Sequence, residues 1–223
     1  MTDRPALPLL TISRMGEAAF LLESGSRVDL DVQARVWTLA ETLAAWPQVL
    51  ETVSGVSSLL VVFDPFALGA DGLEQALRRA WETATGTAPA ERLVEIPVEY
   101  GGAFGADLAD LAAHAGISPA EYVSRHSGGE YRVLAIGAVP GFPYLAGLDP
   151  ILGMPRRDVP RLRLEAGSII VGGTQAGILP VTSPSGWHVL GRTRLTLFDP
   201  SASPPVALGP GDRIRFVVEN FEP

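Results

Sequence analysis

The stretch Ala166–Gly177, AGSIIVGGTQAG, sets the pattern for the second half of this chain. Its apolar, β-branched centre Ser168–Val171 is typical of a buried strand, and the glycines on either side favour tight turns. Short strands between glycine or proline turns recur from Glu130 onward, and this regular spacing predicts a closed β-barrel or a β-sandwich. Short helices are expected before them, over residues 106–115 and 118–126. The expected strands cover residues 131–136, 161–164, 168–171, 187–192, 195–198 and 213–218.

The part of the chain before residue 90 has a different organisation. Apolar residues recur at helical spacing over residues 31–46, where Pro47 ends the pattern, and again over residues 71–83. This order of elements predicts a small sheet with antiparallel pairs and helices on one face. The segment Gly86–Ala90 is the expected joint between two domains. Strands are expected over residues 9–13, 18–23, 49–53, 58–63 and 92–96.

Length and composition exclude several classes of protein. A chain of 223 residues with 47% hydrophobic and 19% charged residues can bury a core, whereas disorder requires low hydrophobicity and high charge. The net charge of −8 argues against nucleic acid or an anionic membrane as the main partner, because both require a basic surface. The chain contains no cysteine and no lysine, which excludes thiol nucleophiles, a lysine-dependent P-loop and covalently attached biotin.

We expect the protein to be soluble and cytoplasmic. Residues Met1–Ala6 lack the basic segment leading into an apolar one that marks a signal peptide. No apolar run approaches the length of about 20 residues that a membrane-spanning helix requires.

A loop rich in proline and glycine, Pro140–Leu148, carries the first candidate binding residues. Prolines restrict its backbone and glycines allow tight bends, so the loop presents Phe142 and Tyr144 in a defined shape. These rings either contact a ligand or close one end of the barrel.

A second proline-bounded loop, Pro155–Arg161, is rich in arginine. Planar guanidinium groups suit the recognition of carboxylate or phosphate. Without further information, pairing with acidic residues of the surface is the favoured alternative. The arginines are Arg156, Arg157 and Arg161, and the acidic residues are Asp149, Asp158 and Glu165.

The turn Gly172–Gly173 and the pair Trp187–His188 complete the set of candidates. A strand that ends in glycines can point backbone N–H groups at an anion, although most such pairs only form a turn. Trp187 is either a core anchor or a substrate platform, and His188 is either a general base or structural. His114, His126 and His188 lack the spacing of metal ligands, so no metal site is expected.

These segments together resemble one known family. The runs PGFPYLAGLDP, PRRDVPR, AGSIIVGGTQAGILPVTSPSGW, GRT and LFDP are similar to the family of 5-oxoprolinase B subunits, also called the KipI family or allophanate hydrolase subunit 1. The similarity extends over nearly the whole chain. Ala138, Leu179 and Ser185 depart from the family pattern, which usually has an aromatic residue, a tyrosine and a glycine at these positions.

The resemblance implies an α+β fold, with a small ferredoxin-like α/β domain over residues 1–88 and a cyclophilin-like β-barrel domain over residues 89–223. It also implies a subunit of an ATP-dependent amidohydrolase, or cyclic amide hydrolase, that opens 5-oxoproline to glutamate. The implied partners are a homologous, KipA-like C subunit and a LamB/YcsF-like third subunit. ATP with Mg is the implied cofactor, shared with these partners, and the chain is expected to be inactive alone.

Roles for individual residues follow from this implied reaction. In a chain without lysine, phosphate can be held only by arginine, backbone N–H groups or a metal. The anion-binding candidates are Arg156, Arg157 and Arg161 with Gly172 and Gly173, and the substrate candidates are Phe142, Tyr144 and Trp187. The catalytic candidates are Gln175, which would donate to a carbonyl, and His188 or His126, which would move a proton.

Two other functions are compatible with the same resemblance. The chain could be a regulatory inhibitor of a sensor histidine kinase, which would require an apolar surface that docks a helical bundle. Alternatively, it could be a carboxyltransferase or allophanate-hydrolase-like subunit of urea-type metabolism, which would require a biotinylated partner.

Overall fold

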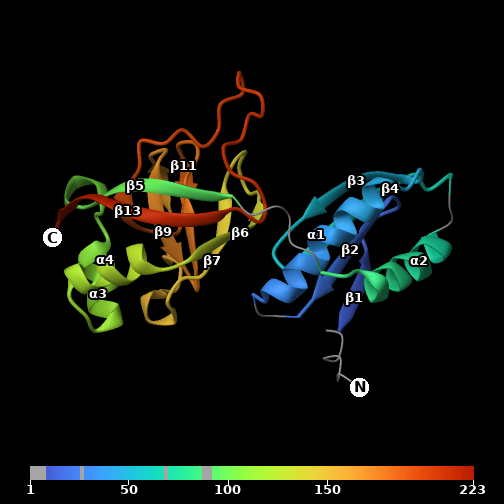
Figure 1. Ribbon diagram of the computed structural model, residues 1–223, viewed down its shortest axis with the longest axis horizontal. Coiled ribbons are helices and arrows are strands. Elements are labelled where there is room, and N and C mark those ends of the chain that lie inside the picture. Colours follow the sequence, from blue (N-terminus) through green and yellow to red (C-terminus); the bar gives the residue numbers. More distant parts are fainter. Residues whose placement is uncertain (1–8, 26–27, 68–69, 87–91) are drawn as a thin grey trace. The chain divides into compact units, whose positions relative to one another are not determined.

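The computed structural model describes residues 9–25, 28–67, 70–86 and 92–223 (Figure 1). The chain divides into compact units, Met1–Pro89 and Ala90–Pro223. Met1–Ala6, where no signal peptide was expected, and all of the expected joint except Gly86 lie outside the described residues. Within those residues, no helix is both long enough and apolar enough to cross a membrane.

The first unit is an antiparallel sheet with the strand order β1-β2-β4-β3. Helices α1 and α2 cover one face of it and share a core with its central strands (Figure 1). The strands and helices predicted over residues 9–83 are present, with ends that differ by at most two residues. The elements are β1 (Leu10–Arg14), β2 (Ala19–Ser24), α1 (Leu30–Ala44), β3 (Val49–Ser54), β4 (Ser58–Phe63) and α2 (Ala70–Thr83).

Alternation along β2 and β4 explains why this sheet has one covered face. Phe20 and Leu22 are buried while the residues beside them are partly exposed, because successive side chains of a strand point to opposite faces. The carboxylate of Asp29 starts α1 by accepting hydrogen bonds from the N–H groups of Asp31 and Val32, at 2.8 and 3.2 Å. The remaining core consists of Val32, Val36, Leu39, Leu43, Leu59, Val61, Phe63, Leu73, Leu77 and Trp81.

The second unit is a closed β-barrel with the strand order β10-β7-β6-β13-β5-β12-β9. The barrel strands are β5 (Leu93–Gly101), β6 (Tyr131–Ile136), β7 (Pro143–Ala146), β9 (Ser168–Gly172), β10 (Gln175–Ile178), β12 (His188–Arg192) and β13 (Arg213–Glu222). The other elements are the short helices α3 (Leu108–Ala115) and α4 (Pro119–Gly128) and the ribbon of β8 (Arg161–Leu164) with β11 (Ser183–Ser185).

The C-terminal strand closes this barrel. β13 pairs parallel with β5 from Arg213 to Glu222. On its other edge, Arg213 and Ile214 pair antiparallel with β6. In Figure 1 the green β5 and the red β13 run side by side, although they are the first and last strands of the unit. Closure leaves no free edge on the barrel, which favours a single register.

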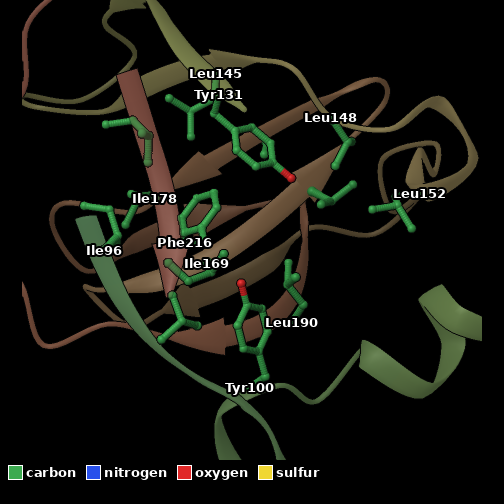
Figure 2. Close-up of a cluster of buried hydrophobic side chains, with 14 of the residues drawn as sticks. Ile96, Tyr100, Tyr131, Leu145, Leu148, Leu152, Ile169, Ile178, Leu190 and Phe216 are labelled. Carbon is green, nitrogen blue, oxygen red and sulfur yellow. The ribbon is translucent and has the colours of Figure 1, made fainter. Parts of the chain in front are cut away.

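Large aromatic and aliphatic side chains fill the barrel. Figure 2 shows Tyr100, Tyr131 and Phe216 directed into the interior. The hydroxyl of Tyr131 donates to the carbonyl of His126 at 2.9 Å, so this buried polar group has a partner. The interior is therefore a packed core, and binding sites have to lie at its ends or outside it.

The structure corrects the predicted strands of the second unit. Leu195–Phe198 is not a strand: Phe198 forms only an isolated bridge with Val206, and the N–H of Leu195 donates to its near neighbour Thr193. β7 and β10 were not predicted, because their glycines and Pro143 resemble turn signals. The strand expected over residues 92–96 was assigned to the first sheet, yet β5 belongs to the barrel.

Candidate functional site

The side chains of Phe142, Tyr144 and Trp187 form one aromatic cluster on the second unit. The ring centroid of Phe142 lies 4.9 Å from that of Tyr144 and 5.7 Å from that of Trp187, and both pairs meet edge to face. This arrangement places the positive edge of one ring against the negative face of another. The structure thus brings together Phe142 directly before β7, Tyr144 within β7 and Trp187 directly before β12.

Gly172 makes room for this cluster. A β-carbon on Gly172 would lie 2.5 Å from the indole ring of Trp187, closer than real β-carbons approach any atom. Only glycine at the end of β9 therefore lets the indole lie flat against the strand. This gives the glycine a steric role at the site.

The cluster forms one wall of a hollow of about 300 Å³, which we call the aromatic cavity. Its volume suits a small metabolite. Apolar walls are provided by Val139, Leu179 and prolines, and hydrogen-bonding groups by Ser183, Ser185 and the loop arginines Arg156 and Arg157. A cavity with apolar walls and few polar groups can hold a small ring and orient its charged substituent.

The residues at which the resemblance implies a departure from the family pattern all line this cavity. Ala138, Leu179 and Ser185 come from three separate segments, and each one lines it. They therefore change the shape and polarity of the same space.

The segment Met154–Arg161, here called the arginine loop, contributes Arg156, Arg157 and Pro160 to the lining of this cavity. Its start is held by paired backbone hydrogen bonds between Met154 and Gly173, at 2.7 and 3.1 Å. The N–H of Arg157 then donates to the carbonyl of Gly186 at 2.8 Å. These bonds place the guanidinium of Arg156 over the Trp187 ring, 5.4 Å from its centroid, within the range of a cation–π contact.

Asp107 binds the other arginines of this loop. Its carboxylate receives two hydrogen bonds from Arg161, at 2.6 and 2.7 Å, and a longer one from Arg157 at 3.3 Å. It also accepts the N–H of Val189 at 2.7 Å. Arg161 lines neither the aromatic cavity nor the second cavity described below, so its fork is directed at Asp107.

Asp107 is 3% exposed and still ionised. Burial alone would raise the pKa of its carboxyl, but the hydrogen bonds from Arg161 and Val189 and the charges of Arg161 and Arg157 outweigh it, so the pKa lies below its usual value. This residue was not among those predicted from the sequence. Its position directly before α3 is typical of a helix cap, yet its side chain does not cap the helix.

A second hollow, of about 480 Å³, lies along the arginine loop and includes His188, and we call it the His188 cavity. Arg156 and Arg157 line both cavities. The Nε2 atom of His188 lies 2.9 Å from the carbonyl oxygen of Pro155. Because a carbonyl only accepts, Nε2 carries the proton, and in the neutral ring Nδ1 is a lone-pair acceptor that has no partner among the described residues.

Other predicted residues lie away from these cavities. His126 is fully buried in the barrel core, where burial lowers its pKa to about 3 and Nδ1 lies 2.9 Å from the hydroxyl of Tyr100. Gln175 starts β10 and lines neither cavity. The N–H of Gly173 donates to Met154, and neither it nor Gly172 lines a cavity. The described residues contain no cluster of three or more potential metal-ligating side chains.

Comparison with known proteins reveals clear relatives. Residues 10–208 match the family model described as "Carboxyltransferase domain, subdomain C and D". The chain is 45% identical to the 5-oxoprolinase B subunit of Escherichia coli O157:H7, over 91% of this chain and 93% of the relative. It is 36% identical to the protein of the same name from Haemophilus influenzae, over 96% of this chain and 100% of the relative.

Solved structures share the fold. The crystal structure of TTHA0988 is similar with a TM-score of 0.78 and 36% identity, over 92% of this chain and 40% of that chain. This chain thus spans about two fifths of TTHA0988. The urea amidolyase of K. lactis has a TM-score of 0.83 over 98% of this chain and 15% of its own, and at 19% identity it shows a likeness of fold.

Proposed function

This chain belongs to the family of 5-oxoprolinase B subunits, and we propose that it is part of a cytoplasmic complex that opens the lactam ring of 5-oxoproline to give glutamate. The observation that carries this proposal to particular residues is the aromatic cavity. It joins an arginine, an indole face and hydroxyl groups in a space of about 300 Å³.

5-Oxoproline has the features that this cavity would recognise. Its carboxylate would bind the guanidinium of Arg156, since charge-assisted hydrogen bonds are strong and directional. Its five-membered ring would lie against Trp187 and Phe142. The lactam amide has one donor and one acceptor, and hydroxyl groups such as those of Tyr144 and Ser183 can serve either.

His188 lines the cavity that shares Arg156 and Arg157 with the aromatic cavity, and we propose that it moves a proton during ring opening across this shared wall. The bond from Nε2 to Pro155 holds the ring in place and leaves Nδ1 as the basic atom. Nδ1 is buried and has no partner among the described residues, so the bound substrate or a partner subunit would have to open a path to it. Opening a lactam adds water to the carbonyl carbon and delivers a proton to the departing nitrogen, so a base that accepts the proton of water can return it. His126 lines neither cavity, and the barrel core encloses the whole ring.

ATP dependence is part of the proposal, but the residues of this chain do not fit a complete nucleotide site. The described part of the chain has no cluster of ligands for Mg, and the N–H of Gly173 is engaged with Met154. We therefore derive no step through the nucleotide on this chain. A homologous, KipA-like C subunit and a LamB/YcsF-like third subunit are the proposed partners that would supply most of that site.

The unit architectures support the proposed fold classes. The closed barrel of the second unit, which has seven strands and excludes β8 and β11, would be cyclophilin-like. The first unit would be ferredoxin-like, with one change: β1 fills the edge place beside β2 that the strand after the second helix fills in that fold. This change leaves β5 free to enter the barrel.

The decisive experiment is reconstitution. The chain is co-expressed and co-purified with the proposed partner subunits, and glutamate released from 5-oxoproline is measured with and without ATP. We expect glutamate only from the complete complex with ATP. Glutamate from this chain alone would contradict a shared site, and none from the complete complex would contradict the proposed substrate.

A carboxyltransferase reaction is a second candidate, favoured by the description of the matching family model. The chain has no lysine, so biotin would have to be attached to another chain. A complex whose activity persists when every biotinylated protein has been removed on avidin would exclude this candidate.

A further inference from the structure

Asp107 occupies the N-cap position of α3, but its side chain does not cap the helix. It stands at the N-terminal boundary of α3, where an aspartate usually accepts N–H groups of the first helical turn. Here the side chain makes no such bond. It points instead to β12 and the arginine loop, and Asp107 exchanges two hydrogen bonds with Val189, because its N–H also donates to the Val189 carbonyl at 3.0 Å.

The charges at this position are unequal. The arginine loop carries three arginines and one exposed carboxylate of its own, Asp158, and the buried carboxylate of Asp107 contacts only two of the arginines, Arg161 and Arg157. Among the described residues, no carboxylate forms an ion pair with Arg156. The site therefore retains one positive charge without a salt bridge, and that charge lies over Trp187 in the aromatic cavity.

We infer that Asp107 is a positioning residue: it turns Arg161 away from both cavities, ties Arg157 at the cavity wall by a longer bond, and leaves Arg156 as the cation that binds the substrate carboxylate. The inference rests on the proposed function for the identity of that carboxylate. Asp107 does not touch the substrate and acts only through the loop. Without its charge, three neighbouring guanidinium groups repel one another, and Arg157 and Arg161 compete with Arg156 for the carboxylate.

The barrel contains a matched control for this residue. Asp212 is also buried, pairs with Arg92 at 2.5 Å and accepts the N–H of Gly209 at 2.8 Å. It lines neither cavity. Asp212→Asn therefore removes another buried carboxylate that pairs with an arginine in the same unit, without changing the arginine loop.

The first test measures arginine reactivity on the full-length chain. Wild type, Asp107→Asn and Asp212→Asn are treated with phenylglyoxal, and modification at each arginine is followed by mass spectrometry. In the wild type and in Asp212→Asn, Arg156 should react faster than Arg157 and Arg161. In Asp107→Asn, the last two should react at a rate close to that of Arg156. Equal rates in the wild type would overturn the inference.

The second test measures kinetics in the reconstituted complex. Asp107→Asn should raise the KM for 5-oxoproline by about tenfold with a much smaller change in kcat, because a carboxylate remote from the reacting bond contributes mainly to binding. Asp212→Asn should leave KM unchanged, even at an equal loss of thermal stability. A KM raised equally by both variants would show a merely structural role and overturn the inference.

The two tests also separate this inference from the proposed function. If the complete complex makes no glutamate but arginine reactivity follows the expected pattern, the proposed substrate is wrong and the positioning role stands. If the complex is active but the three arginines react alike in wild type and variant, the positioning role is wrong and the proposed function stands.

Discussion

The guanidinium of Arg156 lies 5.4 Å from the centre of the Trp187 ring, and this contact defines the aromatic cavity chemically. The indole face attracts the cation and holds a flexible side chain over the cavity. Arg163 on β8 offers the opposite case, since its side chain is 73% exposed and its ion-pair partner among the described residues is the nearby Glu165. Arg156 is held in place by the indole ring beneath it, whereas Arg163 extends into solvent.

Arg156→Ala should weaken substrate binding. Loss of one charge-assisted hydrogen bond costs about 1.5–3 kcal/mol, so the KM for 5-oxoproline in the complete complex should rise by about 10- to 100-fold. Steady-state kinetics measures this directly. Arg163→Ala is the matched control and should keep the wild-type KM. Equal effects of both substitutions would remove Arg156 from the binding site.

Gly172→Ala should displace the Trp187 ring, which forms part of the wall of the aromatic cavity. The added methyl group would lie 2.5 Å from the Trp187 ring, so the indole has to move. Overpacking of this kind costs about 1–3 kcal/mol of unfolding free energy and should also raise KM. Urea denaturation and kinetics measure the two effects. Gly128→Ala, where a β-carbon meets nothing within 4 Å, is the control and should lose no stability.

The stability of the barrel should depend on pH through His126. Burial lowers the pKa of this histidine to about 3, whereas in the unfolded chain it is about 6.5. Between these values the unfolded state binds the proton and the folded state does not. The unfolding free energy should therefore fall as the pH drops below about 6.5, by up to about 1.4 kcal/mol per pH unit.

His126→Phe removes the titrating group and places a ring among Tyr131 and Phe216, which already contact it. Unfolding free energies measured by urea denaturation between pH 5 and 7 should then vary less with pH than those of the wild type. An identical pH dependence would show that other groups account for it.

His188→Ala should reduce kcat in the complete complex and leave KM nearly unchanged. Loss of a general base lowers the rate by about 10²- to 10⁴-fold. His114 lines the same cavity but is exposed at the end of α3, so His114→Ala serves as the control. A full rate in His188→Ala would leave this residue with only its structural bond to Pro155.

Local sequence was sufficient for much of the fold. The helical spacing over residues 31–46 and 71–83 and the β-branched runs over residues 49–53 and 58–63 predicted α1, α2, β3 and β4. Local sequence did not predict β7 and β10, because glycine and proline, which these strands contain, are more typical of turns. Leu195–Phe198 has the composition of a strand but not a strand partner along its length.

The sequence by itself determined which segments are candidates for the site. They are the loop Pro140–Leu148, the arginine loop, the turn Gly172–Gly173 and the pair Trp187–His188. Only the tertiary structure decided their roles. Asp107, which lies 54 residues before Arg161, binds that arginine and not its own helix, and Gly172 serves the Trp187 ring. The physical reason is that turns and helices depend on near neighbours, whereas the partner of a buried charge depends on which distant segments the closed barrel brings together.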